Sequence, residues 1–438
     1  MRVNTRHPLV AVLAVALLTV PWLVIRGFGL VDDLPTAVVI LVSGVSVIGA
    51  AFILTWAAET AEVDVPRSFA LAVLAIIAVA PEYAVDALYA WEAGAAPGTP
   101  ASENAANLAV ANMTGANRIL VGLGWSLIAL YAVYRAGTSG DENVHQREGF
   151  LANAVALEKR VSVEILFLGV ATVYAFLIPF GEGIGIIDAV FLVGLYAVYV
   201  GVILRGETTH EPQLGVPGYL QNLARPRRIT AILAMFVYSA FVILIAVKPF
   251  AKGLETLGPQ LGLSSFFMIQ WVAPLASESP EFIATAYLVR KLRTTSAFNA
   301  LISSKLNQWT LLIGTLVVVY SLSLGYYDVL RFNQKQAGEI WLTAAQSFFA
   351  LTLLVDFEIS VREALALLGL FAFQFLPYFQ QYEGLLLYSG LYVVLGVGVL
   401  VARRNHLREL FATAKRFVLH PSSQPDEPGE PASEPNDA

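Results

Sequence analysis

Two apolar segments of this sequence each carry a proline followed by a glutamate near the middle. Residues 69–91 read FALAVLAIIAVAPEYAVDALYAW, and residues 271–290 read WVAPLASESPEFIATAYLVR. A proline inside a helix has no N–H to donate and displaces the carbonyl one turn earlier. A bilayer has no water to satisfy that carbonyl, so interrupted backbone persists there only where protein or a cavity surrounds it. An acid beside such carbonyls indicates a cation site, whereas the alternative is a kinked helix whose acid pairs with a neighbouring helix.

Each Pro-Glu segment is followed by another apolar segment with an asparagine near its start. ANMTGANRILVGLG follows the first, and LISSKLNQWTLLIG follows the second. Asn117 and Asn307 each precede a glycine by seven residues, at Gly124 and Gly314. A pair of interrupted apolar segments in corresponding positions of two halves is the sequence pattern of a transporter binding site.

The rest of the chain is also apolar. Of its 438 residues 57% are hydrophobic and 14% charged, against about 25% charged in a soluble domain. Cysteine is absent and the five histidines lie outside the apolar runs, which excludes disulfides, thiolate metal sites and a histidine-ligated metal site within the membrane. No nucleotide-binding motif occurs. We therefore predict an all-α polytopic membrane protein that is not an enzyme, needs no cofactor and binds no nucleotide or nucleic acid.

The apolar runs are each long enough to cross a bilayer. They predict about twelve helices, at 10–27, 36–59, 68–92, 104–135, 161–180, 184–204, 229–250, 266–290, 297–324, 339–357, 362–379 and 384–402. With the N-terminus inside, 20 of the 27 Lys and Arg fall on the cytoplasmic side, as basic residues do in membrane proteins. This predicts an integral plasma-membrane protein with both termini cytoplasmic.

The two Pro-Glu helices are the third and eighth of the series, so they cross in opposite directions. The sequence therefore predicts two inverted five-helix repeats with one extra helix at each end. The predicted division is 1–35 (extra helix), 36–204 (first repeat, Pro-Glu stretch about 69–124), 205–228 (cytoplasmic linker), 229–379 (second repeat, stretch about 266–316), 380–402 (extra helix) and 403–438 (a basic, then acidic and disordered tail).

This doubled pattern resembles the sodium/calcium exchanger superfamily of cation/calcium antiporters. The two repeats of that family read G-T-S-x-P-E and then G-N-x-x-G-S-N-x-x-N, where this chain has IAVAPE with ANMTGANRIL and ASESPE with LISSKLNQWT. The resemblance implies that Glu82 and Glu281 are the central calcium ligands. Calcium takes six to eight hard oxygen ligands in flexible geometry, which agrees with such a site.

The resemblance also implies further ligands, namely Asn117, Asn307, Ser277 and Ser303. Ser303 and Asn307 place a hydroxyl and an amide one turn apart on one helix face. For each of these residues the alternative is a hydrogen bond between helices. The chain departs from the family where Ala78 and Val79 replace the Thr and Ser before the first Pro-Glu. Because those hydroxyls help to form sodium sites in the family, the departure favours protons over sodium as the counter-ion.

Three more residues are candidates for ion coupling. Asp86 lies one turn after Glu82, Glu278 stands where the family has serine, and Lys305 lies next to the second asparagine region. Lys305 either pairs with Glu278 or Glu281 as an internal cation, or extends to the membrane interface. We interpret Arg118, Glu164 and Asp188 as structural.

The predicted function is secondary active antiport of calcium, or another divalent cation, against sodium or protons. The alternatives are a transporter of potassium, magnesium or manganese with the same fold, a membrane protein that binds an ion without transporting it, and an intramembrane enzyme with Glu278 and Glu281 as acid and base. The expected partners are the lipid bilayer and the transported cations. The sequence leaves the coupling ion, the stoichiometry, the physiological direction and the oligomeric state open.

Overall fold

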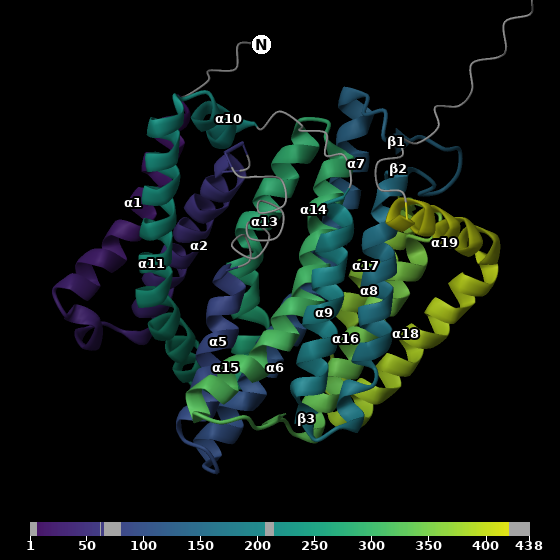
Figure 1. Cartoon of the computed structure of the whole chain (residues 1–438). Helices are drawn as coiled ribbons and strands as arrows, with labels where there is room; N and C mark the ends of the chain where they lie inside the picture. Colours follow the sequence, from purple (N-terminus) through teal and green to yellow (C-terminus); the bar gives the residue numbers. More distant parts are fainter. Residues whose placement is uncertain (1–6, 62, 65–79, 206–213, 420–438) are drawn as a thin grey trace, which may run out of the picture.

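A computed structural model describes residues 7–61, 63–64, 80–205 and 214–419. The chain forms a bundle of long helices (Figure 1). The helices of the first half are α1 (Pro8–Gly27), α2 (Thr36–Ala61), α5 (Ala80–Ala95), α6 (Pro100–Ile119), α7 (Ser126–Ser139), α8 (Ser162–Ala175) and α9 (Ile186–Ile203). Those of the second half are α10 (Gly215–Gln221), α11 (Arg225–Gln260), α12 (Ser265–Phe267), α13 (Ala273–Arg290), α14 (Thr294–Asn307), α15 (Ile313–Leu324), α16 (Gln334–Leu353), α17 (Val361–Phe373), α18 (Tyr382–Ala402) and α19 (Arg404–Leu419).

Eight helical stretches of the described chain are long and apolar enough to cross a membrane. They are Pro8–Gly27, Thr36–Ala61, Pro100–Gly137, Lys159–Phe180, Ile186–Ile203, Arg225–Gln260, Thr294–Leu324 and Tyr382–Ala402. The all-helical membrane class is therefore confirmed. Each of the twelve predicted ranges contains a helix, whereas the number that cross the bilayer stays a prediction. Residues 69–79 of the first Pro-Glu segment, and the predicted disordered tail, residues 420–438, lie outside the described residues.

Three helices of the bundle contain short π-helical segments with wider turns. These are η3 (Leu120–Trp125) between α6 and α7, η6 (Met268–Val272) before α13, and η7 (Gln308–Leu312) between α14 and α15. Such segments commonly occur at functional sites. Here η3 and η7 begin shortly after Asn117 and Asn307, so the two asparagine helices share this feature. The sequence analysis did not predict it.

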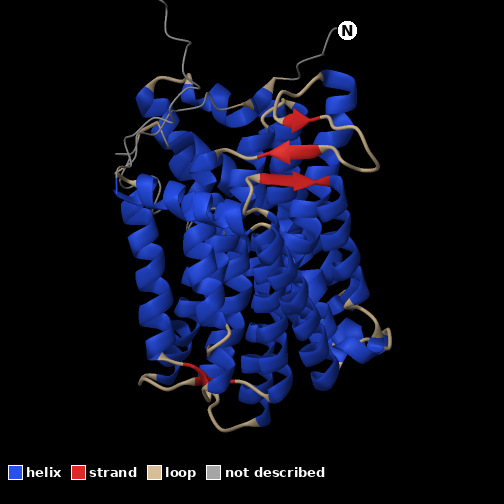
Figure 2. Ribbon diagram, turned by 90° about the vertical axis from the view of Figure 1, so that its right-hand side faces the viewer, coloured by secondary structure: helices blue, strands red, loops and turns tan. Residues whose placement is uncertain are grey.

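Short strands link elements that are distant in sequence. In the first sheet β2 (Ala154–Ala156) pairs antiparallel with both β1 (Val144–His145) and β5 (Glu358–Ser360). In the second, β3 (Gly183–Ile184) pairs with β4 (Leu330–Arg331). Figures 1 and 2 show the first sheet at one end of the bundle, and β3 at the other. The strands tie the first half of the chain to the second at both ends.

Close helix packing surrounds the predicted site. Apolar side chains from most helices form one large buried cluster. A Cβ added to Gly124 would lie 2.8 Å from the Phe282 ring, and one added to Gly314 would lie 2.7 Å from Val193. Both glycines after the asparagines thus allow close approach of a neighbouring helix, as small residues do between membrane helices.

Candidate ion-binding site

The first Pro-Glu helix brings two acids into the interior. Glu82 and Asp86, one turn apart on α5, are 3% and 0% exposed. Asp86 accepts a hydrogen bond from the Asn112 amide at 3.0 Å. One oxygen of each carboxylate is buried without a hydrogen-bond partner. Ala78 and Val79 lie outside the described residues.

The second Pro-Glu helix, α13, also contributes two acids one turn apart. Glu278 is fully buried and accepts a hydrogen bond of 2.6 Å from the Gln308 amide. Glu281 accepts one of 2.9 Å from the Ser304 hydroxyl. The second Glu278 oxygen is buried without a partner. Each acid helix is therefore held by polar groups of the asparagine helix that follows it.

The four acids of the two Pro-Glu helices lie near one another. The charge of Glu82 is within interaction range of Glu278, Glu281 and Asp86, and Glu278 is within range of Glu281. In the described part of the chain, no three His, Asp or Glu side chains surround one point as they would around a bound metal. The arrangement thus offers neighbouring carboxylates, of which two can balance one divalent charge.

The interrupted backbone of the second repeat is compensated at one of its two carbonyls. Pro280 cannot donate to the carbonyl of Ala276, and the Ser279 hydroxyl donates to it instead at 2.8 Å. Pro274 cannot donate to the carbonyl of Gln270, which faces Gly115 on α6. A Cβ at Gly115 would lie 1.7 Å from that oxygen. The sequence predicted free carbonyls here, and the Ala276 carbonyl is instead hydrogen-bonded.

Asn117 and Lys305 meet in the interior. The Lys305 ammonium donates to Asn117 Oδ1 at 2.8 Å and to the Asn117 carbonyl at 3.3 Å. It also lies 4.4 Å from the centre of the Trp309 ring. Because Lys305 is fully buried, it does not extend to the membrane interface. Among the described residues it forms no ion pair with Glu278 or Glu281, although the Glu278 charge acts on it from further away.

Asn307 and Ser303 share one face of α14, as predicted, and this face meets tyrosines. Asn307 accepts a hydrogen bond from the Tyr83 hydroxyl at 2.9 Å and donates to the Tyr196 hydroxyl at 3.0 Å. Ser303 is hydrogen-bonded to Tyr199. The serine that meets Glu281 is Ser304, and the role of Ser303 as an ion ligand stays a prediction. The other predicted serine, Ser277, is buried and donates to the carbonyl of Pro274 at 3.2 Å.

The sequence analysis missed several polar residues of this region. Asn112 lies five residues before Asn117, and Gln308 directly follows Asn307. Their amides donate hydrogen bonds to Asp86 and Glu278. Tyr83 directly follows Glu82 in the sequence. For Tyr83 and Gln308 the available signal was their position next to a candidate ligand, and for Asn112 it was its place within the ANMTGANRIL motif.

A model of the family described as sodium/calcium exchanger protein matches residues 35–205 and 231–376. A crystal structure of the H⁺/Ca²⁺ exchanger CAX is 41% identical to this chain, covers 94% of it and 98% of the matched chain, and has a TM-score of 0.85. The chain belongs to the sodium/calcium exchanger family.

Other solved structures share the fold at low identity. The structure of native YfkE is 14% identical, covers 87% of this chain and 99% of its own, and has a TM-score of 0.58. A structure of the sodium-calcium exchanger NCX_Mj is 14% identical, with 78% and 98% coverage and a TM-score of 0.50. No curated protein matched the chain.

Arg118 forms a separate buried group beside the site of this exchanger. Its guanidinium pairs with the Glu339 carboxylate on α16, and both side chains are fully buried. It also donates to Gln374 at 3.1 Å and lies 4.8 Å from the Trp271 ring centre. These contacts agree with the structural interpretation of Arg118, because they join α6 to α16 and α17.

Asp188 and Glu164 also have structural partners. Asp188 caps α9 by accepting from the Gly185 N–H at 2.7 Å, and it accepts from Tyr174 at 2.8 Å. Glu164 accepts from the Tyr199 hydroxyl at 3.2 Å. Both agree with the interpretation made from the sequence.

Proposed function

We propose that this chain exchanges calcium for protons across the membrane by alternating access. The observation that carries the proposal is that carboxylates of both Pro-Glu helices lie within electrostatic range of one another, and that three of them, Glu82, Asp86 and Glu278, are buried with an oxygen that has no hydrogen-bond partner. Two carboxylates neutralise one divalent cation, and buried charges must be paired to be tolerated. When calcium leaves, the same carboxylates remain neutral only if they accept other cations. Competition for one set of acids couples the two fluxes.

Two observations favour protons over sodium as the counter-ion. The solved structure with 41% identity is that of an H⁺/Ca²⁺ exchanger. Ala78 and Val79 offer no side-chain oxygen at the positions where the family has hydroxyls that help to form sodium sites. A carboxyl group needs no further ligand to bind a proton, whereas sodium needs several oxygens.

The proposed ligands are Glu82 and Glu281 at the centre, with Asn117, Asn307, Ser277 and Ser303 as helpers. Asp86, Glu278 and Lys305 are proposed to serve in coupling or relay. Oxygen donors of this kind suit calcium. In the structure two of the proposed ligands accept hydrogen bonds from other side chains: Asn117 from Lys305, and Asn307 from Tyr83. We therefore propose that calcium displaces these internal partners when it binds.

The proposed mechanism rests on two inverted repeats, 36–204 and 229–379, with both termini in the cytoplasm. It is supported by the matching order of acid helix, asparagine helix and π-helical segment in each half. In such transporters one group of helices rocks against another around a central site.

The test is uptake of radioactive calcium into proteoliposomes that contain purified protein. An outward proton gradient, an outward sodium gradient and no gradient would be compared, with Glu82→Gln and Glu281→Gln alongside. We expect proton-driven uptake that both variants lose. Uptake driven only by the sodium gradient would show that the counter-ion is sodium and not the proton. No calcium uptake under any gradient would overturn the proposal, and the same vesicles would then be tested with potassium, magnesium and manganese.

A further inference from the structure

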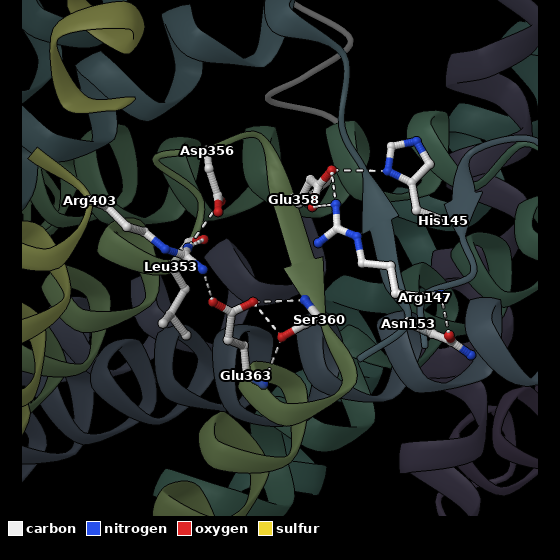
Figure 3. Close-up of polar contacts among 9 residues, drawn as sticks. All are labelled: His145, Arg147, Asn153, Leu353, Asp356, Glu358, Ser360, Glu363 and Arg403. Carbon is white, nitrogen blue, oxygen red and sulfur yellow. Dashed lines mark hydrogen bonds and ion pairs between the residues drawn. The ribbon is translucent and has the colours of Figure 1, made fainter. Parts of the chain in front are cut away.

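Helix α19 has a fixed position at the end of the last apolar span. Arg403, between α18 and α19, donates to the Leu353 carbonyl at 2.6 Å and to Asp356 at 3.0 Å, and it pairs with Glu363 (Figure 3). These bonds join the turn to the segment between α16 and α17. Figure 1 shows α19 lying crosswise beyond α18. The helix is therefore held in place where the chain leaves the apolar layer.

One face of α19 packs on the protein. Leu410, Ala414 and Phe417 are buried, and α19 contacts α8 and the short η4 helix (Lys159–Val161). Glu409 pairs with Lys159 of η4 at 2.9 Å. The spacing of the buried residues is that of an amphipathic helix with one apolar stripe.

A second stripe of α19 combines unpaired cations with exposed apolar side chains. Its members, spaced by three or four residues along one side of the helix, are Arg404, Arg408, Phe411, Lys415 and Leu419. Phe411 is 52% and Leu419 is 61% exposed. Within the described chain the three basic residues have no carboxylate partner. The described residues thus leave both the charge and the apolar surface of this stripe uncovered.

We propose that this stripe of α19 binds anionic phospholipid headgroups of the adjacent leaflet. Basic residues next to a membrane attract acidic lipids, and apolar side chains between them enter the boundary with the acyl chains. The bilayer is the occupant that the position indicates, because α18 is an apolar span that ends one residue before α19. This proposal is independent of the transport site, since none of the five residues belongs to it.

The experiment uses the absence of cysteine in the chain. A bimane fluorophore on Phe411→Cys places an aromatic ring where the phenyl group was. Asn405→Cys, exposed on α19 but outside the stripe, is the matched control. The full-length protein would be reconstituted in nanodiscs of phosphatidylcholine with or without phosphatidylglycerol, together with a phosphatidylcholine that carries a nitroxide quencher near the headgroup.

We expect stronger quenching at position 411 in the discs that contain phosphatidylglycerol, and a fall of about half when Arg404, Arg408 and Lys415 are all changed to Gln. Quenching at position 405 should not depend on the anionic lipid. Calcium uptake by the triple variant would show that it is folded. Equal quenching at position 411 in both lipid compositions would overturn the proposal. So would a rise in quenching after deletion of the acidic residues 421–438, because the tail would then be the occupant.

Discussion

The Lys305 side-chain nitrogen lies 2.8 Å from Asn117 Oδ1 and therefore occupies a side chain that we propose as a calcium ligand. The contact joins the asparagine helices of the two halves. The Lys305 nitrogen donates to both the side-chain and the backbone oxygen of Asn117. It must give up its bonds to Asn117 before that side chain can bind calcium.

The first prediction concerns the charge of Lys305. In Lys305→Met calcium should reach Asn117 without a competing cation, so its apparent KM in proteoliposome uptake should fall by about tenfold, since like charges a few ångströms apart repel by kilocalories. Lys305→Arg keeps the charge and should stay closer to wild type. An unchanged KM in Lys305→Met would show that Lys305 and calcium do not compete.

The second prediction uses the two tyrosines on Asn307. Tyr83 donates to the amide oxygen, whereas Tyr196 accepts from the amide nitrogen. Only the oxygen can bind calcium. Tyr83→Phe should therefore lower the KM for calcium by about threefold, as expected for one hydrogen bond of about 0.5–1.5 kcal/mol. Tyr196→Phe is the matched control and should leave the KM near that of wild type. Equal effects of the two changes would argue against Asn307 as a ligand.

The membrane class and the family could be predicted because they rest on local patterns. Apolar length indicates a span, and the doubled Pro-Glu segments identify the family. The contacts within the site could not be predicted from such local patterns. Ser303 and Ser304 are adjacent, and helix packing alone decides that Ser304 meets Glu281 while Ser303 meets Tyr199. The π-helical segments change the register of the side chains that follow them, and no residue type signals them.

The basic region after α18 also could not be fully predicted from the sequence. It was interpreted as part of a tail because it is charged and follows the last span. Its buried residues Leu410, Ala414 and Phe417 have helical spacing, which the emphasis on charge overlooked. The contact of α19 with α8 depends on the turn that Arg403 fixes, and tertiary contacts determine that turn.

The third prediction concerns the contact between Gly115 and the Gln270 carbonyl. Gly115→Ala would place a Cβ 1.7 Å from a backbone oxygen, so α6 and η6 would have to separate. We expect a loss of about 1–3 kcal/mol in stability, seen as a lower midpoint in thermal unfolding followed by tryptophan fluorescence, together with weaker calcium uptake. Gly194→Ala on α9 is the control, because nothing lies within 4 Å of the added Cβ. A midpoint for Gly115→Ala at or above that of wild type would contradict the packing described here.

The fourth prediction concerns pH and the ion pair between Asp64 and Arg228, which joins the end of α2 to α11. The guanidinium donates to both carboxylate oxygens, at 2.5 and 2.7 Å, and this hydrogen bonding holds the pKa of Asp64 below its usual value. A lowered carboxyl pKa stabilises the fold at pH values above the unfolded pKa of about 3.9, and the contribution is lost as the pH falls through the folded pKa. Asp64→Asn should therefore lower the unfolding midpoint by the equivalent of about 1–2 kcal/mol near neutral pH.

The gap between the unfolding midpoints of wild type and Asp64→Asn should stay constant down to about pH 5 and close below about pH 4. Asp32→Asn, at an exposed acid, should produce no such gap. A gap that widened on acidification would reverse the sign of the linkage and contradict the role assigned to Arg228.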